Sequence, residues 1–215
     1  MAVILLVGAT GLIGGHVAGL IPANQLHIVT RRAVNTHAKQ SVGLSENWPS
    51  LISATKPTVA ISALGTTMKQ AGSQSAFRAV DYDLMLNVAT AAKAAGARQF
   101  IMVSSVGASA RASQFYLKTK GEAEDAVKAL GFGRVDILRP GLLKGARQGP
   151  VRPVESALIA ITAITDFLTP AVLSQYRSTE ARTVAQAIAA LAGQAEGGVH
   201  IHHNAEMLAL VRTIG

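Results

Sequence analysis

A tyrosine and a lysine in the middle of the chain have the spacing of a proton-transfer pair. Tyr116 and Lys120 are four residues apart in a stretch that predicts a helix, so both side chains are expected on one helix face. An ammonium beside a phenol stabilises the phenolate, which makes Tyr116 a candidate general acid or base at a carbonyl or hydroxyl group. Ser105 ends the preceding predicted strand, where it can donate a hydrogen bond to the same substrate oxygen.

The first fifteen residues predict a strand, a turn and a helix that could bind a cofactor for such a pair. The apolar run over residues 2–7 predicts a strand buried on both faces, and Gly8, Gly11 and Gly14 follow it directly. Apolar residues then recur at helical spacing. A strand, a glycine turn and a helix together bind a pyrophosphate, because glycine lets the backbone approach it and the helix N-terminus carries free N–H groups. The alternative is a turn in which glycine has only a steric role.

A second strand is predicted over residues 26–30 and ends at Arg31 and Arg32. At this distance from the glycines, dinucleotide-binding folds carry either an acid that binds ribose or an arginine that receives a 2′-phosphate. No Asp or Glu precedes Glu46. The arginine pair therefore favours NADP(H) over NAD(H), with a solvated basic turn as the alternative.

Strands and helices alternate through the first two thirds of the chain. Further strands are expected over 57–64, 99–103 and 135–138, and helices over 77–95 and 115–130. A strand within 33–56 is expected to be short or missing, a short helix is expected to begin at 48–50, and 68–75 is expected to be a polar loop. This alternation predicts an α/β fold, a Rossmann-like doubly wound parallel sheet with helices on both faces.

We expect residues 1–215 to form a single NAD(P)-binding domain, to which 141–182 adds a small C-terminal cap on the substrate side. Helices are predicted over 154–168 and 183–191, and a last strand over 199–203. Three histidines in that strand, His200, His202 and His203, alternate without nearby acids or cysteines. We interpret them as exposed strand histidines and expect no metal.

Composition narrows the class of protein. Hydrophobic residues make up 49% and charged residues 15%, which indicates a substantial core. The net charge of +8 is spread along the chain and aromatic residues are 4%, so we expect no nucleic-acid partner. Apolar runs fall short of the ~20 residues of a membrane span, so we expect no membrane partner. The chain has no cysteine, and we expect a cytoplasmic protein. We also expect a monomer or homodimer that acts on a small molecule.

Several segments together carry a family resemblance. The chain resembles the short-chain dehydrogenase/reductase superfamily, and most of all its atypical NADP-binding members similar to the Tat-interacting-protein-type oxidoreductases. The matching segments fall in order over about residues 1–145: 8–14, 30–32, 64–67, 69–72, 77–81, 104–108, 116–122 and 138–141.

The resemblance implies a catalytic triad of Ser105, Tyr116 and Lys120. Tyr116 would exchange a proton with the substrate oxygen, Lys120 would hold the nicotinamide ribose, and Ser104 is an alternative to Ser105. The chain departs from the superfamily near Asp81, where many members carry a further catalytic asparagine. The implied cofactor-binding residues are Gly8, Thr10, Gly11, Leu12, Ile13, Arg31, Arg32, Leu64, Gly65, Lys120 and Pro140.

The expected function is hydride transfer to or from a small carbonyl or alcohol substrate with NADP(H). Two alternatives stay open. One is an enzyme similar to the nucleotide-sugar epimerases and dehydratases, which begin with the same hydride step. The other is a protein without catalysis that binds NADP(H) and passes its occupancy to a partner.

Overall fold

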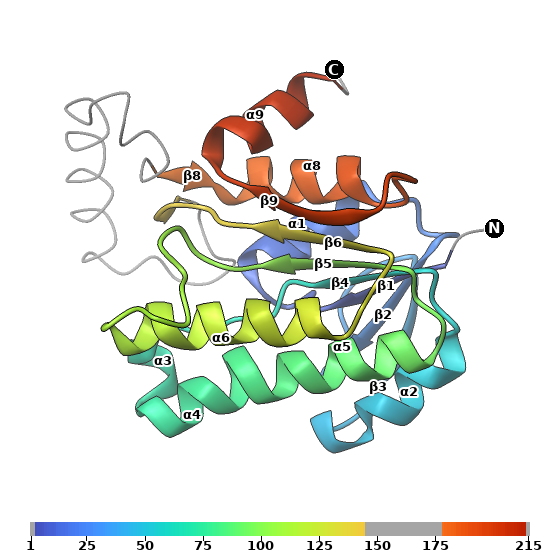
Figure 1. Cartoon of the computed structure of the whole chain (residues 1–215). Coiled ribbons are helices and arrows are strands. Elements are labelled where there is room, and N and C mark those ends of the chain that lie inside the picture. Colours follow the sequence, from blue (N-terminus) through green and yellow to red (C-terminus); the bar gives the residue numbers. More distant parts are fainter. Residues whose placement is uncertain (1–2, 145–177, 214–215) are drawn as a thin grey trace.

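The computed structural model of the chain describes residues 3–144 and 178–213 (Figure 1). The first strand, β1 (Ile4–Val7), lies inside the sheet and is buried along its whole length. Ile4 and Leu6 pack into the core on one side of the sheet, and Leu5 and Val7 pack into the core on the other side. A strand covered on both faces needs apolar side chains in both directions, which explains the continuous apolar run in the sequence.

All strands of the main sheet are parallel. β1 lies between two neighbours and aligns Ile4 with Leu26 on one side and with Val59 on the other. The remaining strands are β2 (Leu26–Thr30), β3 (Lys39–Val42), β4 (Val59–Ser62), β5 (Gln99–Val103), β6 (Arg134–Leu138) and β9 (Gly198–His202). Their order is β3-β2-β1-β4-β5-β6-β9, so the predicted Rossmann-like doubly wound sheet is confirmed.

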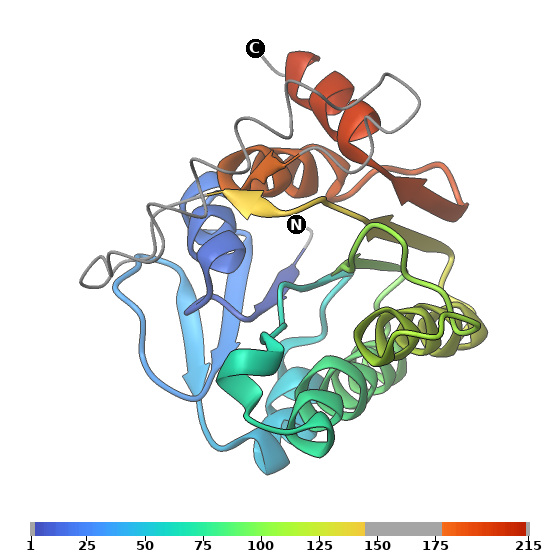
Figure 2. The same cartoon turned by 90° about the vertical axis from the view of Figure 1, so that its left-hand side faces the viewer.

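Helices cover both faces of this sheet (Figures 1 and 2). One face is covered by α1 (Leu12–Leu20) and α8 (Ala181–Leu191), and α9 (Asn204–Arg212) packs on α8. The other face is covered by α2 (Trp48–Thr55), α5 (Met85–Ala94) and α6 (Phe115–Ala129). Because all the strands are parallel, their carboxyl ends lie at one edge of the sheet, where ligands bind in such folds.

The long predicted helix at 77–95 has a more complex form. It is built from α4 (Gln74–Arg78), the π-helical segment η2 (Ala79–Leu84) and α5. The stretch 68–75, expected to be a loop, contains the short helix α3 (Met68–Ala71), and a 3₁₀ turn (η1, Ser45–Asn47) precedes α2. Thr67 caps α3 with its side chain, which accepts a hydrogen bond from the Gln70 N–H.

The C-terminal part is described only outside residues 145–177. Most of the expected cap at 141–182, including its predicted helix at 154–168, therefore lies outside the described residues. At the two borders of this segment, β7 (Leu143–Lys144) pairs in parallel with β8 (Thr179–Glu180). The predicted helix at 183–191 and strand at 199–203 are present as α8 and β9, whereas α9 was not expected. Among the described helices, none has the length and apolar character to cross a membrane.

Candidate active site

The glycine turn after β1 is packed too tightly for side chains. Gly8 has a positive φ of 86°, and a Cβ built on it would lie 2.6 Å from the Ala63 carbonyl group that follows β4. A Cβ on Gly14 would lie 2.1 Å from the Gly8 carbonyl oxygen. The turn and the first turn of α1 can contact each other only because both positions lack a side chain.

This turn directs free N–H groups to the carboxyl edge of the sheet. α1 begins at Leu12, and its N-cap residue Gly11 has no side chain to satisfy the first N–H groups. Ile13 has a buried side chain, so this residue can meet a ligand only through its backbone, while Thr10 and Gly11 are exposed. Unpaired N–H groups and the positive end of the helix dipole together favour an anion.

Arg31 and Arg32 follow β2 at the same edge and are both exposed. Within residues 3–144 and 178–213 neither of them has an acidic ion-pair partner. The loop after them is fixed by Gln40, whose side chain donates to the Val34 carbonyl oxygen at 3.1 Å and accepts from the Val34 N–H at 3.0 Å. Two guanidinium groups without an acidic partner in the described part of the chain therefore lie beside the strand that carries the glycine turn.

The segment η2 meets α6 through a buried ion pair. The Lys120 Nζ lies 2.7 Å from Oδ1 of Asp81, and the two side chains are 7% and 0% exposed. Oδ2 of Asp81 accepts a hydrogen bond of 2.9 Å from the Thr66 N–H. A Cβ built on Gly65 would lie 3.8 Å from the Lys120 Nζ and 3.5 Å from Oδ1 of Asp81, so this glycine directly adjoins the ion pair. Leu64 precedes it, half-buried.

Tyr116 lies on the first turn of α6, one turn before Lys120, as the spacing predicts. Its half-buried ring packs on Phe77 of α4 with 5.3 Å between ring centroids. Phe77 also contacts Phe115. The tyrosine is thus positioned by an aromatic cluster.

The two serines after β5 have different surroundings. Ser104 is buried and donates a 2.5 Å hydrogen bond to Glu124 of α6. Glu124 also accepts from the Arg139 guanidinium, with Nη2 to Oε2 at 2.5 Å. Ser105 is half-buried, and its hydroxyl lies 3.3 Å from the Val106 carbonyl oxygen. Ser104 is therefore engaged in a structural contact, whereas the Ser105 hydroxyl contacts the neighbouring Val106 carbonyl oxygen.

Pro140 joins the ends of two strands. It follows β6 and is buried, and its carbonyl oxygen accepts a 3.0 Å hydrogen bond from the Val106 N–H. This contact fixes the loop that carries Ser105 against the end of β6. Within the described residues, the hydroxyls of Ser105 and Tyr116 form no hydrogen bond with each other.

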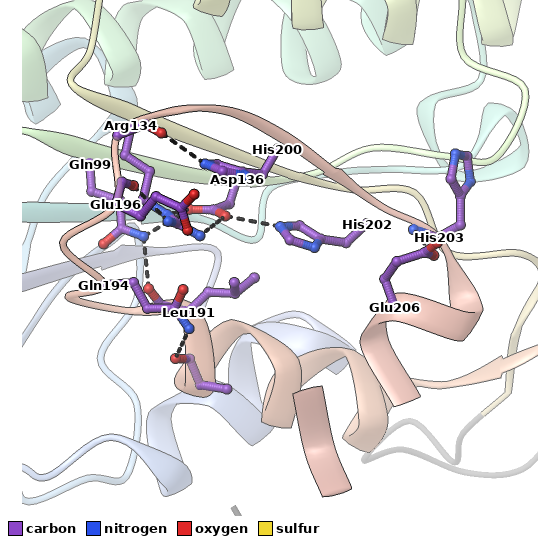
Figure 3. Close-up of polar contacts among 12 residues, drawn as sticks. Gln99, Arg134, Asp136, Leu191, Gln194, Glu196, His200, His202, His203 and Glu206 are labelled. Carbon is purple, nitrogen blue, oxygen red and sulfur yellow. Dashed lines mark hydrogen bonds and ion pairs between the residues drawn. The ribbon is translucent and has the colours of Figure 1, made fainter. Parts of the chain in front are cut away.

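A second polar cluster was not foreseen from the sequence (Figure 3). Asp136 is fully buried in β6 on the sheet face that α8 covers. Its carboxylate accepts from Arg134 Nε at 2.7 Å and from Gln99 Nε2 at 2.8 Å, and His202 Nε2 lies 2.9 Å from it. Burial alone raises the pKa of Asp136, but the hydrogen bonds from His202, Arg134 and Gln99 outweigh it and hold the pKa below its ordinary value.

The histidines of β9 belong to this cluster. His200 and His202 point to the same face, with their rings stacked at 6.4 Å between centroids. His202 is half-buried beside Asp136, so it is not the exposed strand histidine that was expected. An aspartate inside the apolar run of β6 was the available sequence signal for this cluster.

Comparison with known proteins identifies a family and several relatives of this chain. A family model described as HIM1 matches residues 27–171. "Protein fmp52, mitochondrial" of Aspergillus clavatus is 40% identical over 172 residues, which cover 74% of this chain and 73% of that protein. The protein of the same description from Meyerozyma guilliermondii is 37% identical over 169 residues, with coverage of 74% and 73%.

Solved structures share the fold at low sequence identity. MoeE5 in complex with UDP-glucose and NAD superposes with a TM-score of 0.70 at 16% identity, covering 99% of this chain and 82% of that chain. The UDP-glucose 4-epimerase of Thermus thermophilus in complex with NAD gives 0.70 at 18% identity, covering 98% and 81%. The dTDP-4-dehydrorhamnose reductase of Bacillus anthracis in complex with NADP gives 0.67 at 15% identity, covering 95% and 76%.

These comparisons change two expectations. The structural neighbours share the Rossmann-like fold that the resemblance implies, and they are described in complex with NAD or NADP. The narrower resemblance to Tat-interacting-protein-type oxidoreductases is not confirmed. The expectation of a cytoplasmic protein is contradicted by relatives that are named as mitochondrial proteins.

Proposed function

Because the chain belongs to the HIM1 family, whose fold here is that of dinucleotide-binding enzymes, we propose that it is an NADP(H)-dependent oxidoreductase of the short-chain dehydrogenase type. The proposed substrate is a small carbonyl compound or the corresponding alcohol. The observation that carries the proposal is the position of Lys120, buried beside Gly65 and one helical turn from Tyr116.

The residues at the carboxyl edge fit a nicotinamide dinucleotide. Gly8 and Gly14 allow the turn after β1 to pack tightly against neighbouring backbone, and the N-terminus of α1 offers N–H groups to a pyrophosphate. Arg31 and Arg32 have the charge and the planar donors that bind a 2′-phosphate, which favours NADP(H). Leu12, Ile13, Leu64 and Pro140 would then line the same edge, together with Thr10, Gly11 and Gly65.

A bound nicotinamide would supply or accept the hydride. In reduction, Tyr116 donates its hydroxyl proton to the carbonyl oxygen of the substrate, which becomes an alcohol. The positive charge of Lys120 stabilises the phenolate that remains. In oxidation the phenolate accepts the proton of the alcohol. Ser105 donates a hydrogen bond to the same oxygen in both directions.

A nucleotide-sugar epimerase or dehydratase is the second candidate. It is favoured by the structural neighbours, because MoeE5 is described in complex with UDP-glucose and with UDP-glucuronic acid, and the UDP-glucose 4-epimerase of Thermotoga maritima is described with UDP-glucose. Both candidates begin with the same proton and hydride transfer. Binding of UDP-glucose to the protein already saturated with dinucleotide, measured by calorimetry, would favour the second candidate over the first.

The proposed cofactor is tested by isothermal titration of the purified protein with NADPH and with NADH. We expect NADPH to bind at least about tenfold more tightly, because charge-assisted hydrogen bonds to the 2′-phosphate contribute about 1.5–3 kcal/mol. Equal affinities would contradict the assignment of Arg31 and Arg32. Failure of both dinucleotides to bind would overturn the oxidoreductase proposal.

The proposed acid–base residue is tested by Tyr116→Phe. We expect NADPH affinity to change little and turnover to fall by about 10²–10⁴-fold, since only the proton-transfer group is lost. Tyr82→Phe is the matched control, because it removes the hydroxyl of a tyrosine that has no proposed role in catalysis. The Tyr82 ring lies on η2, with its centroid 4.1 Å from the Arg78 guanidinium carbon. Turnover that survives in Tyr116→Phe would show that another group exchanges the proton. NADPH binding with no turnover in the wild type would favour the sensor alternative.

A further inference from the structure

The loop that follows β5 is attached to α6 at its first residue. Ser104 donates a 2.5 Å hydrogen bond to Glu124, a residue of the third turn of α6 that is 1% exposed. The Ser104 N–H donates to the Leu138 carbonyl oxygen of β6 at 2.7 Å. The start of this loop is therefore bound to the helix through its side chain and to the neighbouring strand through its backbone.

Glu124 also holds the end of β6. Arg139 directly follows β6 and donates to both carboxylate oxygens, from Nε to Oε1 at 3.0 Å and from Nη2 to Oε2 at 2.5 Å. A bidentate pair fixes the orientation of the two side chains as well as their distance. The next residue, Pro140, accepts a 3.0 Å hydrogen bond from the Val106 N–H. One buried carboxylate thus connects α6 with the ends of β5 and β6.

The same helix also contacts the loop a few residues further on. The Ser109 N–H donates to the Leu117 carbonyl oxygen of α6 at 3.2 Å. A Cβ built on Gly121 would lie 2.1 Å from the Ser109 carbonyl carbon and 2.2 Å from the Ala110 nitrogen, so the loop crosses the helix where it lacks a side chain. Ser105 therefore lies in a segment, residues 104–109, that contacts α6 at both of its ends.

Tyr116 lies on this same helix. Residues 116, 120 and 124 are each four positions apart, so they follow one face of α6. Lys128, one turn further along, lies 4.0 Å from Glu124 and 3.0 Å from Asp125, so Arg139 is the closer cation to Glu124. The helix that carries the phenol thus also holds the segment that carries Ser105.

We propose that Glu124 is a positioning residue that sets the place of Ser105 relative to Tyr116. The proposal rests on the proposed function for the use that is made of these two hydroxyls. Two groups can act on one substrate oxygen only if both reach it in the correct geometry. Without the Glu124 charge, Arg139 and Ser104 lose their common partner, and the segment that carries Ser105 is released from the helix.

The first test is Glu124→Gln, which removes the charge and keeps the size of the side chain. Amide hydrogen exchange measured by NMR follows the Val106 N–H, whose bond to Pro140 holds the segment in place. We expect this amide to exchange about tenfold faster in the variant, because the segment opens locally. The Gly43 N–H, bonded at 3.0 Å to the Thr30 carbonyl oxygen beyond the far strand β3, should change by about twofold or less.

Glu122→Gln is the matched control variant. It removes an acid two positions away on the same helix, where Glu122 pairs with Arg78 on a more exposed side of α6. Exchange of the Val106 amide should change by about twofold or less in this control. An unchanged Val106 exchange rate in Glu124→Gln overturns the proposal.

Turnover provides a second readout through a double-mutant cycle with Ser105→Ala, using NADPH and 4-nitrobenzaldehyde. We expect Glu124→Gln to lower kcat about tenfold and to leave the KM for NADPH within about twofold. In the Ser105→Ala background the same substitution should lower kcat by about twofold or less, since the displaced group is already absent. Equal losses of kcat in both backgrounds would show that Glu124 supports only the fold, against the proposal.

Two further outcomes are separable. If the wild type does not turn over the aldehyde, the result counts against the proposed function, and the exchange measurement decides the role of Glu124 alone. If Glu124→Gln does not fold, Ser104→Ala takes its place, because it removes the contact with β5 and keeps the ion pair with Arg139. We expect about threefold faster Val106 exchange in Ser104→Ala, and no change there would overturn the proposal.

Discussion

At the scale of single residues, the positively charged side chains at the carboxyl edge of the sheet differ in their burial and in their ion pairing. Lys120 is buried and compensated by Asp81 within 2.7 Å. Arg31 and Arg32 are exposed and uncompensated within the described part of the chain. A compensated buried charge is suited to hold a geometry, whereas uncompensated exposed arginines are suited to attract and bind a phosphate.

This difference predicts the effect of Arg31→Ala/Arg32→Ala. We expect NADPH affinity to fall about tenfold to a hundredfold, because one or two charge-assisted hydrogen bonds to the 2′-phosphate are lost. NADH, which lacks this phosphate, should lose about threefold or less. Calorimetry of both dinucleotides measures the two losses. Lys39→Ala/Arg98→Ala is the charge-matched control, because both residues are exposed at the amino ends of their strands. Equal losses for NADPH and NADH would contradict the role.

At the scale of elements, α1 is held against the β1 turn by the absence of side chains. Gly14 faces the Gly8 carbonyl oxygen, whereas Gly19 on the same helix has no atom within 4 Å of a built Cβ. The two glycines therefore offer a matched pair within one helix. Only at Gly14 does packing exclude a side chain.

We expect Gly14→Ala to destabilise the protein by about 1–3 kcal/mol or more, because the added methyl group must displace backbone. Gly19→Ala should instead stabilise it by about 0.5–1 kcal/mol, since alanine loses less conformational entropy than glycine in a helix. Urea unfolding followed by circular dichroism measures both. Similar effects of the two substitutions would show that the turn can relax around a side chain.

At the scale of the whole molecule, the C-terminal part is joined to the sheet by the cluster around Asp136. Gln99 of β5 donates to the Leu191 carbonyl oxygen at the end of α8 and accepts from the Gly193 N–H, each at 2.8 Å. His202 of β9 contacts Asp136 across 66 positions of sequence. The last strand and α8 are therefore tied to β5 and β6 by buried polar contacts as well as by the apolar core.

We expect Asp136→Asn to cost about 3–5 kcal/mol at pH 7, because Arg134 loses its buried counter-charge. The pKa of Asp136 is lowered in the folded state, so its contribution is present above the ordinary value of about 3.9 and is lost as the pH falls below it. The difference in the free energy of unfolding between variant and wild type should therefore shrink as the pH falls from about 4 toward 3. Urea unfolding across this range measures it. Asp125→Asn, at an exposed ion pair, is the control, with an expected cost below about 1 kcal/mol. A difference in unfolding free energy that stays constant with pH would contradict the proposed link between stability and the protonation of Asp136.

The sequence by itself determined the sheet, the glycine turn and the helix that carries Tyr116 and Lys120. These features are local: burial on both faces makes a strand apolar throughout, and a side-chain spacing of four places two groups on one helix face. A third strand was expected to be short or missing, and it is present as the short β3. Arg31 and Arg32 follow the second strand, as predicted. The interruption of the helix at 79–84 and the helix α9 have no comparable local pattern.

Only the tertiary structure decided which polar groups meet. The spacing placed Lys120 near Tyr116, but its pairing with Asp81 depends on how two helices align. Ser104 and Ser105 are adjacent and alike in sequence, and only packing against Glu124 separates their surroundings. His202 and Asp136 meet because β6 and β9 are neighbours in the sheet. Pairs formed between distant segments leave no periodic signal in the sequence, since each partner alone satisfies only its own local pattern.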